Sequence, residues 1–147
     1  MAAKPVATNR RARRDFEILD TVEAGIVLVG SEVKSLRGGK AQIAEAYARI
    51  TKGEAWLLGM YIPPYPQAGT AFSHEPERPR KLLLHRKEIQ KLQRSLDTQP
   101  LTLIPLSMYF SGKNAKVSLA LARRKQKQDK RRQIDERDAA REAKSTR

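Results

Sequence analysis

Three charged residues stand close together in the stretch SEVKSLR: Glu32, Lys34 and Arg37. Basic side chains bind phosphate, and a carboxylate accepts hydrogen bonds from a base amine or a ribose 2′-hydroxyl. Such a group is therefore suited to contact RNA. The alternative is a solvated helix face with Glu32 near the positive end of the helix dipole. The residues alone slightly favour this alternative.

A second group of charged residues lies at the C-terminal end of the chain. Residues 123–147 contain eleven Lys or Arg, five Asp or Glu, and Ile134 as the single large aliphatic residue. Opposite charges stand three or four residues apart at Arg131 and Asp135, Arg132 and Glu136, and Asp138 and Arg141. Helical ion pairs of this spacing contribute about 0.2–0.5 kcal/mol each, which cannot offset an ordering cost of about 1–2 kcal/mol per residue. We expect this tail to be disordered when free and helical along a polyanion, although a merely solubilising extension has the same composition.

The distribution of charge divides the 147 residues into three parts. Residues 1–14 carry five basic and no acidic residues, and a formal charge of +14 for the whole chain leaves only +3 for residues 15–122. We expect a flexible basic arm (1–14), one barrel domain (15–122) and the basic tail (123–147). Such a charge excess points to nucleic acid or an anionic membrane. A membrane-binding helix needs Trp, Phe or Leu opposite its bases, so nucleic acid remains, and the residues do not choose between RNA and DNA.

Signatures of catalysis are weak. The chain has no cysteine, and its two histidines, His74 and His85, have no metal-ligand spacing. His85 is interpreted as a helix-start residue and His74 as a polar loop residue. The stretch RGGKA lacks the first glycine of a phosphate-binding loop and has Ala41 where Ser or Thr is needed. We expect no enzyme activity, cofactor, metal or small-molecule substrate. With no apolar run of about 18 residues, we expect a cytoplasmic protein with no membrane partner.

The elements that position these residues are short. Hydrophobic patterning predicts strands over 16–22, 26–29, 45–50, 54–62, 100–110 and 115–122, with a break at Gly25. It predicts helices over 31–37, capped by Ser31, and over 85–96. Residues 63–80 are expected to form a loop in which Tyr65 and Phe72 are free to stack on bases, while most other aromatic residues belong to the core.

The predicted fold is mainly β with short flanking helices. Two small helices cannot cover both faces of an antiparallel sheet, so closure into a small barrel is the economical solution. A barrel of oligonucleotide-binding type is one such architecture, and other small barrels fit the pattern equally well.

The motifs, taken in order, resemble a known family. The stretch NRRARRDFEILDTVEAGIVLVGSEVKSLRGGK is followed by AYARI, WLLGMYIPPY, RKLLLHRKEI, LTLIPLSMYF and DKRRQIDERDAARE. From Asn9 to about Glu142, this order and spacing is similar to the SsrA-binding protein (SmpB) family, the partner of transfer-messenger RNA in bacterial ribosome rescue.

The resemblance implies an oligonucleotide-binding barrel that binds the transfer-RNA-like domain of that RNA and delivers it to a stalled ribosome for trans-translation. It implies RNA contacts by Arg10, Arg11, Arg13, Arg14, Glu32, Lys34, Arg37, Lys40, Arg123, Arg124 and Lys125. It implies that the tail enters the messenger path and the decoding region of the small ribosomal subunit through Lys127, Asp129, Lys130, Arg131, Arg132, Ile134 and Arg137.

The chain departs from the family pattern at the start of the tail. Ala120 and Arg124 stand where glycine is usual, and Gln128 stands where an aromatic residue or His is common. Arg124 lacks the backbone freedom of glycine but adds a possible phosphate contact. A ribosomal or ribosome-assembly structural protein would share the basic arms and the small barrel, and it is the alternative to the adaptor function.

Overall fold

A computed structural model describes residues 5–64 and 74–125 of the chain. Its strands are β1 (Pro5–Thr8), β2 (Phe16–Ile26), β3 (Tyr47–Thr51), β4 (Glu54–Leu58), β5 (Arg80–Leu83), β6 (Thr102–Ser111) and β7 (Asn114–Arg124). Its helices are α1 (Ala12–Asp15), α2 (Gly30–Arg37) and α3 (Arg86–Thr98).

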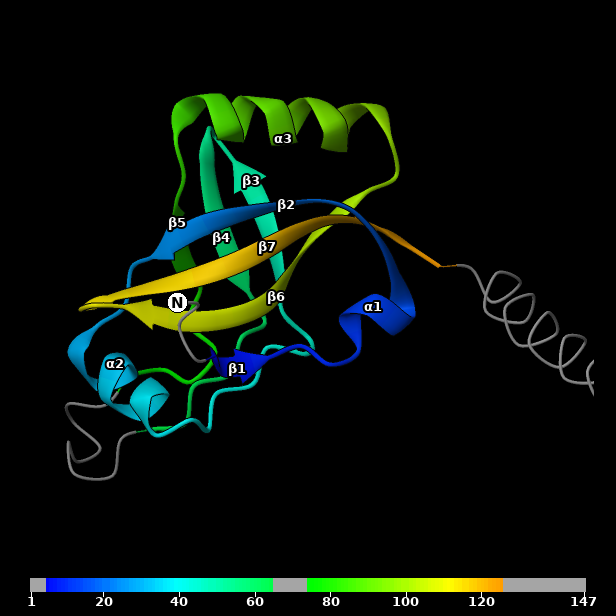
Figure 1. Cartoon of the computed structure of the whole chain (residues 1–147). Coiled ribbons are helices and arrows are strands. Elements are labelled where there is room, and N and C mark those ends of the chain that lie inside the picture. Colours follow the sequence, from blue (N-terminus) through cyan, green and yellow to red (C-terminus); the bar gives the residue numbers. More distant parts are fainter. Residues whose placement is uncertain (1–4, 65–73, 126–147) are drawn as a thin grey trace, which may run out of the picture.

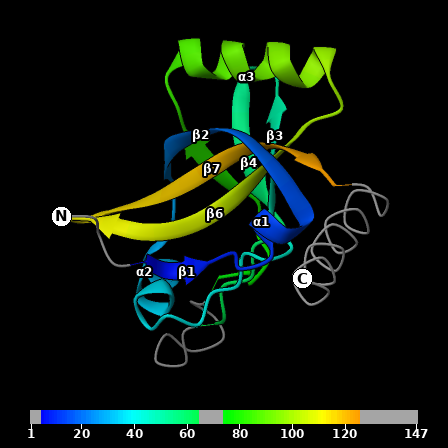
Figure 2. The same ribbon diagram turned by 45° about the vertical axis from the view of Figure 1, so that its right-hand side comes forward.

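The strands form one closed antiparallel sheet. Their order is β1-β6-β3-β4-β5-β2-β7, and an additional pairing of β6 with β7 completes a ring of six strands with β1 added to β6. Figure 1 shows α3 across one end of this ring, with α1 and α2 beside different parts of it, and Figure 2 shows the same arrangement after a turn. The predicted fold, a small antiparallel barrel of oligonucleotide-binding type with flanking helices, is confirmed.

The barrel interior is filled by alternate residues of the strands. In β7, Val117, Leu119 and Leu121 are buried in the main core, and Leu57 of β4 and Leu103 of β6 join them. This alternation is the period-2 pattern of a strand with one face in a core. A smaller cluster on the other face of β6 and β7 packs Ile104, Ala120 and Ala122 against Ala12 of α1.

Strand β2 differs from the prediction of two separate runs. It continues through Gly25, which pairs with Leu83 of β5 on one side and Lys116 of β7 on the other, and a Cβ added at Gly25 would lie 3.3 Å from Leu83 Cβ. A glycine inside a strand here marks a close contact and not a break. The expected buried strand over 26–29 is also wrong, since Ile26 ends β2, and Val27 and Val29 are each 45% exposed.

The N-terminal segment pairs with the barrel over its described part. β1 is antiparallel to β6, and Asn9, which is buried, donates from Nδ2 to the carbonyl oxygen of Pro105 at 3.0 Å. The register of β6 shifts between Pro105 and Ser107, so Asn9 satisfies a carbonyl beside an irregular step in the ladder. The expectation of a separate flexible arm over 1–14 therefore differs from the structure over residues 5–14.

The remaining strands and α3 position the sites described below. β3 and β4 form the predicted hairpin, with positive φ at both Lys52 (52°) and Gly53 (76°), as a tight two-residue turn requires. β5 was not predicted and closes the gap between β4 and β2. α3 was predicted, and His85 is its N-cap, with the backbone N–H of His85 donating to Glu88 Oε1 at 3.0 Å.

Candidate nucleic-acid interface

Glu32 lies in the first turn of α2 and is fully buried, with 0% of its side chain exposed. Its Oε1 accepts from the backbone N–H of Val29 at 2.9 Å and from Arg78 Nη2 at 2.6 Å. Its Oε2 accepts from Arg80 Nε at 2.6 Å. These three residues occupy the carboxylate, so the structure contradicts a direct contact between Glu32 and RNA.

The surroundings of Glu32 keep it ionised. Burial by itself raises the pKa of a carboxyl group, but hydrogen bonds from Arg78, Val29 N–H and Arg80 outweigh this effect, and the pKa of Glu32 lies below its ordinary value. Burial lowers the pKa of Arg80, and Glu32 partly restores it, so this guanidinium remains charged. The pair is a buried ion pair supported by further hydrogen bonds.

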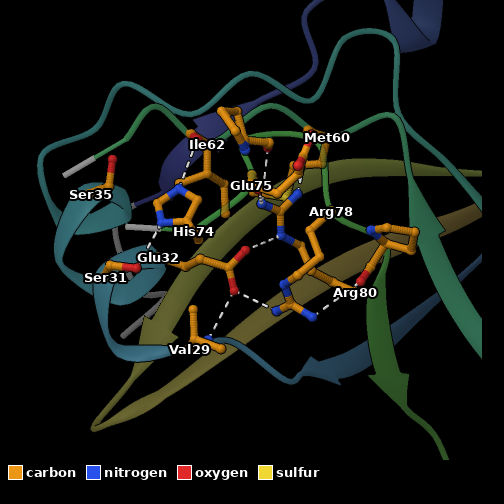
Figure 3. Close-up of polar contacts among 12 residues, drawn as sticks. Val29, Ser31, Glu32, Ser35, Met60, Ile62, His74, Glu75, Arg78 and Arg80 are labelled. Carbon is orange, nitrogen blue, oxygen red and sulfur yellow. Dashed lines mark hydrogen bonds and ion pairs between the residues drawn. The ribbon is translucent and has the colours of Figure 1, made fainter. Parts of the chain in front are cut away.

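Arg80 connects three segments to each other (Figure 3). Besides Glu32, it donates from Nη1 to the Met60 carbonyl oxygen at 2.8 Å and from Nη2 to that of Pro76 at 3.0 Å. Both Arg80 and Glu32 are 0% exposed, whereas Arg78 is 34% exposed. We refer to Glu32, Arg78 and Arg80 as the buried charge cluster; it holds α2, β5 and the chain near residues 60 and 76 together.

Polar side chains on α2 extend this attachment. Ser31 Oγ and His74 Nδ1 lie 2.9 Å apart, and His74 Nε2 lies 2.9 Å from the carbonyl oxygen of Ile62. Ser35 Oγ donates to the Pro63 carbonyl oxygen at 2.6 Å. Ser31 is therefore not the predicted cap of α2, because no side chain caps this helix at its N-cap, Val29, and the N–H of Val29 is bound by Glu32.

The basic residues of α2 lie away from this buried side. Lys34 is two positions after Glu32 and points to the opposite side of the helix, as helical geometry requires. Lys34, Arg37 and Lys40 are all exposed. The guanidinium of Arg37 lies 4.1 Å from the centre of the Phe110 ring, a cation–π contact that orients it. These three residues form the α2 basic patch, and Glu32 does not belong to it.

The other predicted contacts meet at the far end of β2. The terminal basic patch comprises Arg10, Arg11, Arg13, Arg14, Arg123, Arg124 and Lys125. The pairing of β2 with β7 places Phe16 opposite Arg124, and Lys125 donates from its backbone N–H to Asp15 O at 2.9 Å and from Nζ to Arg13 O at 3.3 Å. Residues more than 100 positions apart in the sequence thus lie close together.

A cavity of about 480 Å³ opens beside the terminal basic patch. Arg11, Phe16, Tyr47 and Arg124 are among its lining residues, and the Arg124 guanidinium lies 6.0 Å from the centre of the Phe16 ring. The ion pair between Arg11 and Glu45 is loose, with the charged groups 3.8 Å apart and both side chains largely exposed. Guanidinium groups in this setting remain accessible to phosphate.

The structure does not bring the two basic patches together. β2 begins beside α1 and ends before α2, and Figure 1 shows these two helices apart from each other. The predicted tail contacts lie outside the described residues: Lys127, Asp129, Lys130, Arg131, Arg132, Ile134 and Arg137. Gln128, Tyr65 and Phe72 lie outside them as well.

Arg78 and Arg80 lie in the stretch that was predicted to be a loop, and the sequence patterns did not indicate a role for them. Their partner, Glu32, lies 46 and 48 positions away, and no local spacing could reveal that contact.

Within residues 5–64 and 74–125, no group of three or more potential metal ligands occurs. Over the same described part of the chain, no helix is long and apolar enough to cross a membrane.

An antiparallel barrel with two exposed basic patches defines a nucleic-acid-binding class of protein. A model of the family described as SmpB protein matches residues 6–147. The chain belongs to the SmpB family.

Individual relatives agree with this assignment. The SsrA-binding protein of Rhodopseudomonas palustris (strain HaA2) is 57% identical over 142 residues, which cover 96% of this chain and 90% of that protein. The SsrA-binding protein of Mycobacterium sp. (strain KMS) is 56% identical over 137 residues, 93% of this chain and 81% of that protein. A solved structure described as "tmRNA-SmpB: a journey to the center of the bacterial ribosome" matches with a TM-score of 0.69 and 46% identity, covering 86% of this chain and 92% of that one.

Proposed function

We propose that this chain is an RNA-binding adaptor that binds the transfer-RNA-like domain of transfer-messenger RNA and delivers it to stalled ribosomes for trans-translation. The observation that carries this proposal is the match to SsrA-binding proteins along nearly the whole chain, including the tail. The SmpB structure that it resembles is described together with tmRNA and the bacterial ribosome. Its place of action would be the cytoplasm, and its function involves no catalysis.

The terminal basic patch is the proposed main contact with the RNA. Its cations lie around the start of β2 and the end of β7, with Arg123 and Arg124 on opposite faces of β7, and arginine forms bidentate hydrogen bonds with phosphate oxygens. The adjoining cavity exposes Phe16 and Tyr47 beside Arg11 and Arg124. The α2 basic patch is the proposed second contact, at which Arg37 is held in place by Phe110. Two separated patches suit a folded RNA that is recognised by its shape and phosphate pattern.

The tail is the proposed contact with the ribosome. Asp129, Lys130 and Arg131 would engage the decoding region of the small subunit, and the residues after them would follow the messenger path as a helix formed on binding. The barrel would then select the RNA, and the tail would recognise the vacant ribosome.

Replacement of Lys130 and Arg131 by Ala in the full chain tests this division. We expect near-normal affinity for isolated transfer-messenger RNA and a loss of peptide tagging on stalled ribosomes. Lys144→Ala, which removes a cation from the same tail, serves as the matched control. Equal loss of RNA binding and tagging would contradict the division between barrel and tail. Retention of the chain on salt-washed ribosomal subunits that lack transfer-messenger RNA would instead support a structural ribosomal protein.

A further inference from the structure

The outer face of β3, β4 and β5 carries side chains that belong to neither basic patch. The register places Arg49 opposite Trp56, and Trp56 opposite Lys81, so one row of three side chains crosses the three strands. Their neighbours along each strand alternate inward, where Ala48, Ala55 and Leu82 are buried. Because alternate residues of a strand share a face, Arg49, Trp56 and Lys81 lie together on the outside of the barrel.

Aromatic and aliphatic side chains are exposed to solvent on this outer β3–β4–β5 face. Tyr47 precedes Arg49 on the same side of β3 and is 40% exposed, and Leu83 follows Lys81 on the same side of β5 and is 54% exposed. Trp56 is half-buried at the centre of the face. Helix α3 lies across the end of the barrel (Figure 2), and its first turn lines a hollow together with Lys81 and Leu83. Aromatic side chains on the outer face of a sheet, here Tyr47 and Trp56, offer a stacking surface for bases.

Cations flank the central tryptophan on both sides. Arg49 is exposed, and Lys81 is 42% exposed and forms only a loose ion pair with Glu54 at 3.4 Å. A surface ion pair of this kind contributes about 0–1 kcal/mol, so a phosphate can displace Glu54 from Lys81. The arrangement has a base-stacking ring at its centre and a phosphate-binding group on each neighbouring strand.

The face is continuous with the terminal basic patch. Tyr47, at the start of β3, also lines the cavity beside Arg11 and Arg124. Arg49 follows two residues later, about 7 Å along the strand, and Trp56 lies opposite it. A nucleic-acid strand that leaves the terminal basic patch past Tyr47 would reach Trp56 without crossing buried surface.

We propose that the outer β3–β4–β5 face binds an unpaired RNA segment, with one base stacked on Trp56 and the adjoining phosphates held by Arg49 and Lys81. This inference rests on the proposed function, because it takes RNA to be the ligand of the chain. It adds a contact that lies on neither the terminal nor the α2 basic patch. Unpaired nucleotides occur in both transfer-messenger RNA and ribosomal RNA, and the experiment distinguishes these two sources.

Trp56 is the single tryptophan of the chain, so its emission reports directly on this face. The full-length protein is titrated separately with transfer-messenger RNA, with ribosomal RNA freed of protein, and with intact small ribosomal subunits. Anisotropy of labelled RNA follows binding in parallel. We expect saturable quenching of Trp56 emission with at least one RNA, and the RNA that quenches identifies the source.

Four variants and one control separate stacking from charge. Trp56→Leu is expected to weaken binding of the quenching RNA about tenfold, the loss typical of one stacked base, while Trp56→Phe retains a ring and most of the affinity. Arg49→Gln and Lys81→Gln should each reduce the slope of log affinity against log salt by about 0.7. Lys113→Gln removes a cation in the turn between β6 and β7, which lies outside this face. It should change neither the affinity for RNA nor the salt slope.

The outcomes distinguish the two proposals. RNA binding by anisotropy with unchanged Trp56 emission would overturn the inference and leave the proposed function intact. Failure of transfer-messenger RNA to bind at all would overturn both. A blue shift with intact subunits and no response to any free RNA would place a protein against this face and would also overturn the inference.

Discussion

The buried charge cluster contains an Arg–Glu ion pair, and an arginine of the terminal basic patch forms another, but the two pairs differ in their access to water. In the cluster, Arg80 and Glu32 are both 0% exposed and lie 2.6 Å apart. At the patch, Arg11 and its partner outside the patch, Glu45, are 64% and 85% exposed and lie 3.8 Å apart. Exposed pairs of this kind contribute about 0–1 kcal/mol, whereas breaking a buried pair costs about 3–5 kcal/mol.

This difference separates structural from functional charge. Removing one partner in the cluster leaves an uncompensated charge inside the protein, so these residues hold the fold together. Removing one partner in the patch changes little in the protein, so these residues are available to a ligand. Burial and hydrogen bonds therefore decide whether an Arg–Glu pair in a basic RNA-binding chain has a structural role or contacts RNA. The sequence alone does not decide this.

The largest expected effect is that of Glu32→Gln on stability. The substitution leaves Arg80 and Arg78 without their counter-charge, and we expect the free energy of unfolding to fall by about 3–5 kcal/mol in urea denaturation. Glu45→Gln, which removes an exposed carboxylate, should stay within about 0.5 kcal/mol of the unchanged protein. Equal stability of the two variants would show that the buried pair does not hold α2.

The same cluster predicts a dependence of stability on pH. The pKa of Glu32 is lowered on folding from an ordinary value of 4.5, so its stabilising contribution is complete well above pH 4.5 and is lost as the pH falls through the folded pKa. The difference in unfolding free energy between the unchanged protein and Glu32→Gln should therefore shrink below pH 4.5. A constant difference from pH 7 to pH 3 would contradict this assignment.

A smaller effect is expected at Asn9, a buried side-chain amide beside the terminal basic patch. Asn9→Ala removes the donor to the Pro105 carbonyl oxygen, and leaving that buried group unpaired should cost about 1–3 kcal/mol in thermal or urea unfolding. Thr8→Ala, at the exposed end of β1, is the matched control. If Asn9→Ala were no more destabilising than this control, the N-terminal segment would not depend on Asn9 for its attachment.

The smallest effect concerns the α2 basic patch. Phe110→Leu removes the ring under Arg37, and we expect loss of this contact to lower the free energy of unfolding by about 0.5–1 kcal/mol. Phe110→Tyr should retain the contact. A double-mutant cycle with Arg37→Gln isolates the interaction from the packing of Phe110 itself. A coupling energy of zero would show that Phe110 does not position Arg37.

The elements predicted from the sequence were those with a strong periodic pattern. α3 and the β6–β7 hairpin have regular apolar spacing, and the turn at Gly53 has a distinctive conformation, so each was predicted. β1 and α1 are four residues each and have little apolar pattern of their own, and they depend on contacts with β6 and β7. Gly25 was taken as a break because sequence patterns do not reveal that Leu83 packs against it.

The candidate site was predictable in composition and not in arrangement. Local charge indicated that Lys34, Arg37 and the arginines near both ends were candidates for nucleic-acid binding. It could not separate Glu32 from its basic neighbours, because the partners of Glu32 come from residues 78 and 80. It also did not indicate that Arg49, Trp56 and Lys81 share a face, since that follows from the pairing of three strands.

The salt dependence of RNA binding tests most directly the claim that exposed terminal charges bind RNA while the buried cluster supports the fold. The slope of log affinity against log salt is measured for the unchanged chain and for the double variant Arg10→Gln, Arg13→Gln, with transfer-messenger RNA as the ligand. We predict a slope smaller by about one for each arginine and an unfolding free energy within about 0.5 kcal/mol of the unchanged chain. An unchanged slope and affinity, with both arginines removed, would contradict this account.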